Sequence, residues 1–117
     1  MTETLKVTPK RLDDLSVIYT QGYINNQGGE EIARVALDLI GDGEKTVLLN
    51  LEGTKIVNSI GISILIEIIE KMIEIEGRLA FCCLTPTIEK TFHIMGLSQY
   101  ASIYKDEASA FTDLGQT

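Results

Sequence analysis

Residues 47–63 read VLLNLEGTKIVNSIGIS, and this stretch decides the fold. It starts as an apolar run typical of a buried strand, crosses a short polar loop and reaches Ser59, which opens a strongly apolar helix. A serine hydroxyl at a helix N-cap can accept a hydrogen bond from a backbone N–H that has no other partner. The same place favours an anion, because the first-turn N–H groups and the helix dipole both attract negative charge. Two interpretations of Ser59 therefore stay open on local features: it only caps the helix, or it carries a phosphate.

The chain around this stretch alternates between strand and helix patterns. Two short strands come first and helix–strand alternation follows, with Gly77 ending the Ser59 helix, Thr85 as the N-cap of the next helix and Pro86 at its first position. This order predicts one α/β domain over residues 1–117, with a mixed sheet of four to five strands and about four helices packed mainly on one side. Strands are predicted at residues 5–8, 15–21, 45–51, 78–84 and 101–104, helices at 30–40, 59–76, 87–95 and 106–114, and an Asn- and Gly-rich loop at 23–29.

Composition excludes several classes of function. The formal net charge is −7, so nucleic acid is not an expected partner. Cys82 and Cys83 are adjacent, which fits neither a CxxC motif nor zinc-ligand spacing, and as strand neighbours they are expected on opposite faces without a disulfide. His93 is the only histidine, and no acid–base or nucleophile–base pair emerges from the sequence. We therefore expect a non-enzyme with no catalytic residue, metal or cofactor.

The membrane is not an expected location either. The longest apolar run, residues 60–69, is interrupted by Gly61, Ser63 and Glu67 and is far shorter than the ~20 residues that span a bilayer. The N-terminal residues have no apolar segment of signal-peptide length. These features predict a soluble, cytoplasmic protein that does not insert into a membrane.

The helix at 59–76 contains more isoleucines than one buried stripe requires. Those near its start, such as Ile60 and Ile62, would either form an exposed apolar patch beside Ser59 or be covered by neighbouring helices. The helical pattern alone does not decide between an interaction surface and a covered face.

Four segments of the chain form a recognisable set of motifs. They are Val47-Leu48-Leu49-Asn50-Leu51, Asn58-Ser59-Ile60-Gly61, Gly22-Tyr23-Ile24-Asn25, and Thr85-Pro86-Thr87-Ile88 through Phe92 to Gly96-Leu97. Together they resemble the STAS-domain family of bacterial anti-sigma-factor antagonists, and the likeness covers nearly the whole chain. In that family, the corresponding segments are a strand reading V-L-N-L, D-S-S-G or D-S-T-G at the start of a helix, G-E-L-D after the second strand, and an S-P-x-V…F…G-L ending.

The resemblance implies a partner switch controlled by phosphorylation. In the family, the unphosphorylated antagonist binds an anti-sigma factor that is also a serine kinase, which frees a sigma factor. The kinase phosphorylates the motif serine, the interface is lost, and a serine phosphatase reverses the change. The resemblance thus makes Ser59 the phosphorylation site of a monomer that forms hetero-complexes. It implies partner-binding roles for Asn25, Asn58, Ser59, Ile60, Gly61 and Ile62.

Three positions depart from the family pattern. Asn25 and Asn58 stand where the family has aspartate, and Ile60 replaces the second hydroxyl. An alternative function is therefore a non-phosphorylated STAS scaffold subunit of a stress-signalling or lipid-transport complex. A third, a small phosphate-binding domain or enzyme, is disfavoured because Gly53, Lys55 and Gly61 do not form a known phosphate-binding loop.

Overall fold

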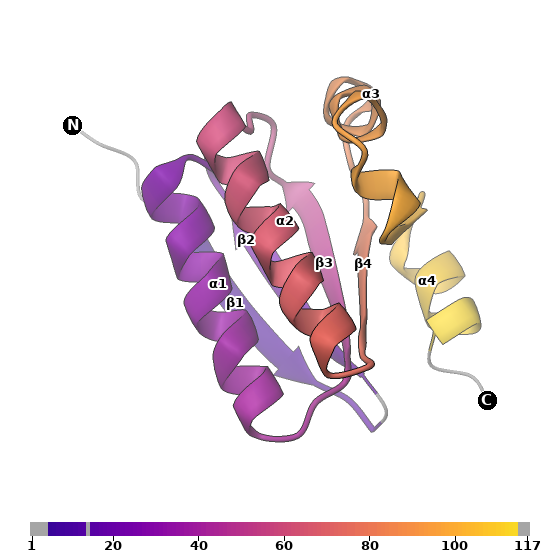
Figure 1. Ribbon diagram of the computed structural model, residues 1–117. Coiled ribbons are helices and arrows are strands. Elements are labelled where there is room, and N and C mark those ends of the chain that lie inside the picture. The colour runs from indigo at the N-terminus through magenta and orange to yellow at the C-terminus, as the bar shows by residue number, and fades with distance from the viewer. Residues whose placement is uncertain (1–4, 14, 115–117) are drawn as a thin grey trace.

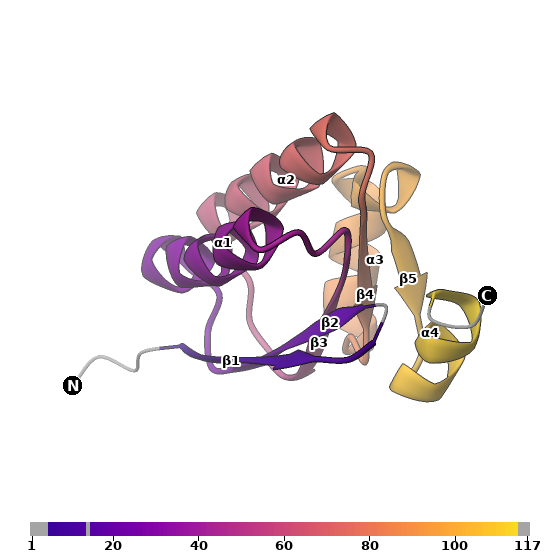
Figure 2. The same ribbon diagram turned by 90° about the horizontal axis from the view of Figure 1, so that it is seen from below.

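The computed structural model describes residues 5–13 and 15–114 and shows a twisted sheet with helices on both faces (Figures 1 and 2). Among the described residues, strands and helices alternate as expected from the third element onward. Their order is β1 (Lys6–Arg11), β2 (Ser16–Gln21), α1 (Asn26–Gly41), β3 (Thr46–Gly53), α2 (Ser59–Glu74), β4 (Arg78–Cys82), α3 (Pro86–Ile94), a 3₁₀ turn η1 (Leu97–Gln99), β5 (Ser102–Tyr104) and α4 (Glu107–Leu114).

The sheet is mixed, as predicted, and its order is β1-β2-β3-β4-β5. β1 pairs antiparallel with β2, whereas β2, β3, β4 and β5 are parallel neighbours. β3 is the central strand, and residues 47–51 are all buried. This burial explains the continuous apolar run, because a central parallel strand is covered on both faces.

Alternate residues of each strand face different helices. Ile18, Leu49 and Phe81 contribute to the larger core under α1, α2 and α3, and the ring of Phe81 meets Phe92 of α3 edge-to-face at 5.0 Å between centroids. Val17 and Leu48 contribute to a smaller core under α4. Three helices thus cover one face and α4 covers the other (Figure 2).

Two element boundaries differ from the prediction for physical reasons. α1 begins at Asn26, so most of the loop expected at 23–29 is helical. Gly28 and Gly29 lie in its first turn, both buried against neighbouring segments, and close packing there overrides their low helix propensity. β1 continues through Pro9, which is tolerated because β1 is an edge strand.

The two cysteines were expected on opposite faces, and this is wrong. Cys83 has a positive φ of 65°, which turns its side chain back toward α4, and the two Sγ atoms lie 3.6 Å apart as free thiols. Burial raises the pKa of both thiols, so neither is a ready thiolate nucleophile.

α2 is the most apolar helix and extends over 16 residues. Its buried face lies on the larger core, with Leu65 and Met72 almost fully enclosed. In the described ranges, no helix is both long and apolar enough to cross a membrane.

Candidate functional site

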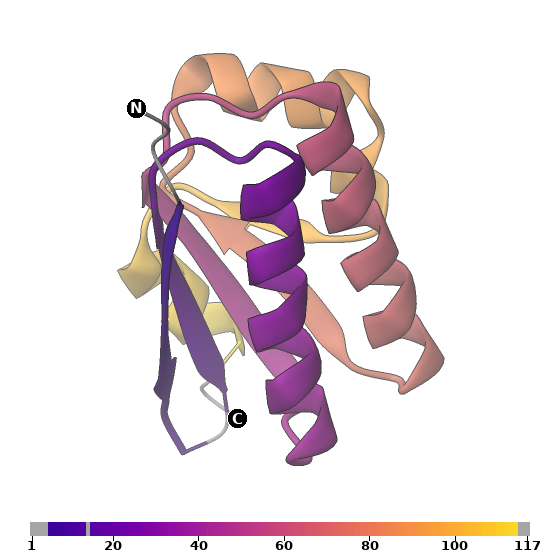
Figure 3. The ribbon, with the colours of Figure 1, turned by 90° about the vertical axis from the view of Figure 1, so that its left-hand side faces the viewer.

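The candidate site lies where two loops meet, one leading from β2 into α1 and the other from β3 into α2. Ile24 and Val57 form a parallel bridge between these loops. The Ile24 N–H donates to the Ile56 carbonyl at 3.0 Å, and the Asn58 N–H donates to the Ile24 carbonyl at 3.1 Å. The bridge brings the first turns of α1 and α2 to the same end of the molecule (Figure 3).

Each of the two helices is capped by an asparagine. Asn25 Oδ1 accepts from the Gly28 N–H at 2.8 Å, and Asn58 Oδ1 accepts from the Gly61 N–H at 2.8 Å. The cap of α2 is therefore Asn58 and not Ser59, which is the first residue of the helix. The structure thus removes the interpretation of Ser59 as a simple cap and leaves its hydroxyl available for another role.

Two glycines allow the helices to approach this closely. A Cβ on Gly61 would lie 2.4 Å from the Ile24 carbonyl oxygen, and one on Gly29 would lie 2.9 Å from Ile64 Cδ1. Any side chain at Gly61 would push α2 away from the Ile24 loop. Gly61 is buried, and it packs under the site against the Ile24 loop.

The surface around Ser59 is apolar, and the isoleucines near the start of α2 divide between exposed and covered positions. Ser59 is exposed, and Ile60 next to it is 54% exposed. Ile62 is only 3% exposed and packs in the larger core, so of the two alternatives left open by the sequence this isoleucine follows the covered one. It lies on the stripe of α2 that faces the sheet, together with Leu65 and Ile69.

Sequence reasoning missed Ile56, which is 59% exposed in the loop before the helix. The signal was present as an apolar residue inside the polar segment GTKIVN. Its carbonyl is held by Ile24, so the position of this loop is fixed by the bridge. Ile56, Ser59 and Ile60 together are called the Ser59 surface below.

The chemistry of the Ser59 surface suits anion attachment and apolar contact. The first-turn N–H groups of Ser59 and Ile60 have no acceptor within the helix, so they form the positive end of α2. A phosphate on the Ser59 hydroxyl would begin at this end. None of the six predicted site residues carries an ionisable side chain near neutral pH, so they provide no general acid or base.

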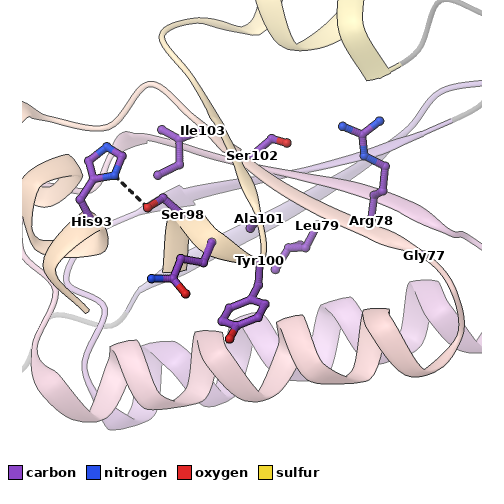
Figure 4. Close-up of a pocket in the computed structure, with 10 residues that line it drawn as sticks. Gly77, Arg78, Leu79, His93, Ser98, Tyr100, Ala101, Ser102 and Ile103 are labelled. Carbon is purple, nitrogen blue, oxygen red and sulfur yellow. Dashed lines mark hydrogen bonds between the residues drawn. The ribbon is translucent and has the colours of Figure 1, made fainter. Parts of the chain in front are cut away.

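A separate pocket of about 440 Å³ lies beside β5, and His93 and Ser98 are among the residues that line it (Figure 4). His93 Nδ1 lies 2.8 Å from Ser98 Oγ, and His93 Nε2 lies 3.5 Å from a Glu89 carboxylate oxygen. The histidine and the carboxylate are both about half exposed, so water screens their interaction. We interpret the group as a clamp between the last turn of α3 and η1. Within the described part of the chain, no cluster of three or more potential metal ligands is found.

Comparison with known proteins finds a family model and a relative that match most of this chain. The family model described as the STAS domain matches residues 6–110. A putative anti-sigma factor antagonist, BtrV, from Bordetella bronchiseptica is 25% identical over 107 residues, which cover 91% of this chain and 92% of that protein.

Two solved structures share the fold. An anti-sigma factor antagonist from Mycobacterium paratuberculosis superposes with a TM-score of 0.85 at 18% identity, covering 97% of this chain and 96% of that chain. The Bacillus cell fate determinant SpoIIAA in its phosphorylated form gives a TM-score of 0.73 at 20% identity, covering 92% and 97% respectively.

Proposed function

Because the chain belongs to the STAS domain family, we propose that it is an anti-sigma-factor antagonist whose binding to an anti-sigma factor is switched off by phosphorylation of Ser59. The observation that carries this proposal is the position of Ser59, exposed at the first residue of α2 beside Ile60. The antagonist names of the Bordetella and Mycobacterium relatives, and the phosphorylated state of the Bacillus protein, support it. The partner is an anti-sigma factor with serine kinase activity, and its capture frees a sigma factor.

The switch works through charge at a contact surface. A phosphoserine carries about −1.5 to −2 charges at neutral pH. At the start of α2 this charge is stabilised by about 0.3–1 kcal/mol, so the antagonist itself stays folded. A partner packed on Ile56 and Ile60 would have to desolvate the same phosphate, and its affinity falls.

The amides at positions 25 and 58 are compatible with this role. Both cap their helices through Oδ1, which an aspartate would do equally well. As neutral groups they add no repulsion to a phosphate on Ser59. The loops therefore keep the geometry of the site without the two carboxylates of the family pattern.

The experiment compares Ser59→Ala and Ser59→Asp in binding to the anti-sigma factor of the same organism, measured by calorimetry. Ser59→Ala should bind like the wild type, and Ser59→Asp should bind at least about tenfold more weakly, which is ~1.4 kcal/mol. Thr87→Asp is the matched control, because Thr87 is also an exposed hydroxyl residue in the first turn of a helix. Equal binding of Ser59→Asp and wild type would refute charge gating.

Mass spectrometry of the Ser59 peptide from native cells tests the modification itself. Phosphate on Ser59 supports the switch. A fully sampled and unmodified Ser59, together with assembly insensitive to both substitutions, would instead favour a scaffold subunit. The observation behind that second candidate is that both family carboxylates are replaced by amides that serve as caps.

A further inference from the structure

A second apolar surface lies away from Ser59, in a groove between α2 and the segment that follows α3. The groove has a volume of about 470 Å³. Its α2 wall is made by three isoleucines one and two turns apart, and its other wall by the end of α3 and η1. The main apolar residues are Ile66, Ile69, Ile73, Met95, Leu97 and Tyr100.

Three of these side chains are unusually exposed for their size. Ile73 is 53% exposed, Met95 is 48% exposed and Tyr100 is 66% exposed. The ring of Tyr100 points toward α2 rather than into the sheet (Figure 4). Contiguous apolar surface of this kind marks interaction sites more often than single scattered residues do. The three side chains converge on one groove from α2, from the end of α3 and from the end of η1, and we call it the Ile73 groove.

The charge beside the groove identifies the chemistry of its occupant. Glu67, Glu70 and Glu74 are exposed and follow i, i+3, i+7 spacing, so they form a row along α2 beside Ile66 and Ile73. Glu70 itself lines the groove. An apolar groove next to a row of carboxylates complements a ligand that is apolar on one side and cationic on the adjoining side.

The same charges argue against other occupants. The chain has a formal net charge of −7, so a nucleic acid or an anionic bilayer would be repelled. A second copy would bring two rows of glutamates together, which is unfavourable as well. Lys71 is the basic residue within the row, and its Nζ lies 3.9 Å from Glu74, so it offsets one of the three carboxylates.

We propose that the Ile73 groove is a docking site for a basic amphipathic helix of a partner protein. Ile66 and Ile73 are seven residues apart, which corresponds to about 10 Å along the helix axis, or two turns. A docked helix therefore presents leucine-like side chains at i and i+3 or i+4 to the groove and lysine or arginine on its flank to Glu70 and Glu74. This contact does not rest on the state of Ser59, because the groove is lined by residues 66–73 and 95–100.

The test uses two synthetic helical peptides, one of leucine and lysine and one of leucine and glutamate with the same pattern. Titration into the ¹⁵N-labelled protein should show that the leucine–lysine peptide shifts amide signals of residues 66–74 and 95–100. The leucine–glutamate peptide should leave them in place. Ile73→Gln and Met95→Gln should each weaken the binding about tenfold, as expected for central contact residues.

Leu37→Gln is the matched control, because Leu37 is 47% exposed on α1 and lies outside the groove. It should bind the leucine–lysine peptide like the wild type. The proposal is overturned if Leu37→Gln loses as much affinity as Ile73→Gln, or if shifts spread evenly over the acidic surface. Equal binding of both peptides, absence of binding, or a dimer formed through the groove in sedimentation would also overturn it.

Discussion

Asn58 is the residue that sets the start of α2. Its extended backbone, with φ −98° and ψ 176°, ends the loop, and its side chain accepts the Gly61 N–H. Its own N–H is held by the Ile24 carbonyl of the neighbouring loop. Asn58 thus connects the β3–α2 loop, α2 and the β2–α1 loop. Because Asn58 is the N-cap, the Ser59 hydroxyl is not needed to cap α2.

Replacing Asn58 by alanine should therefore destabilise the protein without touching the Ser59 hydroxyl. Loss of an N-cap lowers the free energy of unfolding by about 1 kcal/mol, within a range of about 0.5–2 kcal/mol. Asn58→Asp should stay within a few tenths of a kcal/mol of the wild type, because a carboxylate caps equally well and favours the helix N-terminus. Urea unfolding of the three proteins measures this. If alanine proved as stable as asparagine, the cap would not matter here.

At the scale of the element, α2 carries two neighbouring isoleucines with opposite roles. Ile60 contributes to the Ser59 surface, whereas Ile62 is enclosed in the larger core. The helical period of 3.6 residues separates them by about 200° around the axis, although they are two positions apart in sequence. Isoleucines occur on all sides of α2, so the sequence does not show whether Ile60 or Ile62 faces the sheet. Only the structure shows this.

This difference gives a paired prediction. Ile62→Ala should lower the free energy of unfolding by about 2–5 kcal/mol, since it opens a cavity in the core. Ile60→Ala should change it by no more than about 0.5 kcal/mol, as for an exposed side chain. Thermal or urea unfolding measures both. Ile60→Glu is then the substitution that tests partner contact in a folded protein, and equal stability losses at the two positions would contradict the assigned rotation of α2.

The strands and later helices were predictable because their signals are local. The apolar run at residues 47–51 and the Thr85–Pro86 start of α3 are both evident in the sequence. The structure confirms them, with Thr85 Oγ1 accepting from the Ile88 N–H. The start of α1 was not predictable, because one of its glycines is explained by a contact with a residue far along the chain. Gly29 faces Ile64, thirty-five positions away.

The candidate site was predictable in part for the same reason. Ser59 and both asparagines stood out by position, and the structure brings them together through the Ile24–Val57 bridge. The choice of Asn58 as the cap depends on a one-residue boundary that sequence patterns do not resolve. The facing direction of Cys83 depends on a positive φ, which the strand pattern around it does not indicate.

At the scale of the whole molecule, α4 closes the second face of the sheet around a polar cluster. Asn50 of β3 is 4% exposed, and its amide donates to the Glu107 carboxylate at 2.6 Å. Tyr19 of β2 packs against the same smaller core, and the Glu107 carboxylate contributes to its raised pKa. Glu107 is the first residue of α4, so this cluster fixes the helix over the strands at one end while Ala110 and Leu114 pack into the smaller core.

The cluster makes the free energy of unfolding depend on pH in the alkaline range. Burial, and then the nearby Glu107 carboxylate, raises the pKa of Tyr19 to about 12 from its ordinary 10.0. Between these two values the unfolded chain has released the proton and the folded protein still holds it, so the free energy of unfolding falls as pH rises. The stabilisation is complete below pH 10 and is lost by about pH 12.

Tyr19→Phe isolates this effect from the other groups that titrate at high pH. The variant should lose the part of the pH dependence that belongs to Tyr19, so the stability difference between wild type and variant should shift in favour of the variant between pH 10 and pH 12. Urea unfolding of both proteins at pH 8, 10 and 11 measures the difference. Parallel curves for the two proteins would show that the ring stays accessible to water and that α4 does not enclose it. A divergence that begins near pH 10 would show that the second face is closed as a unit, because the tyrosine proton is protected only while α4 stays docked through Glu107.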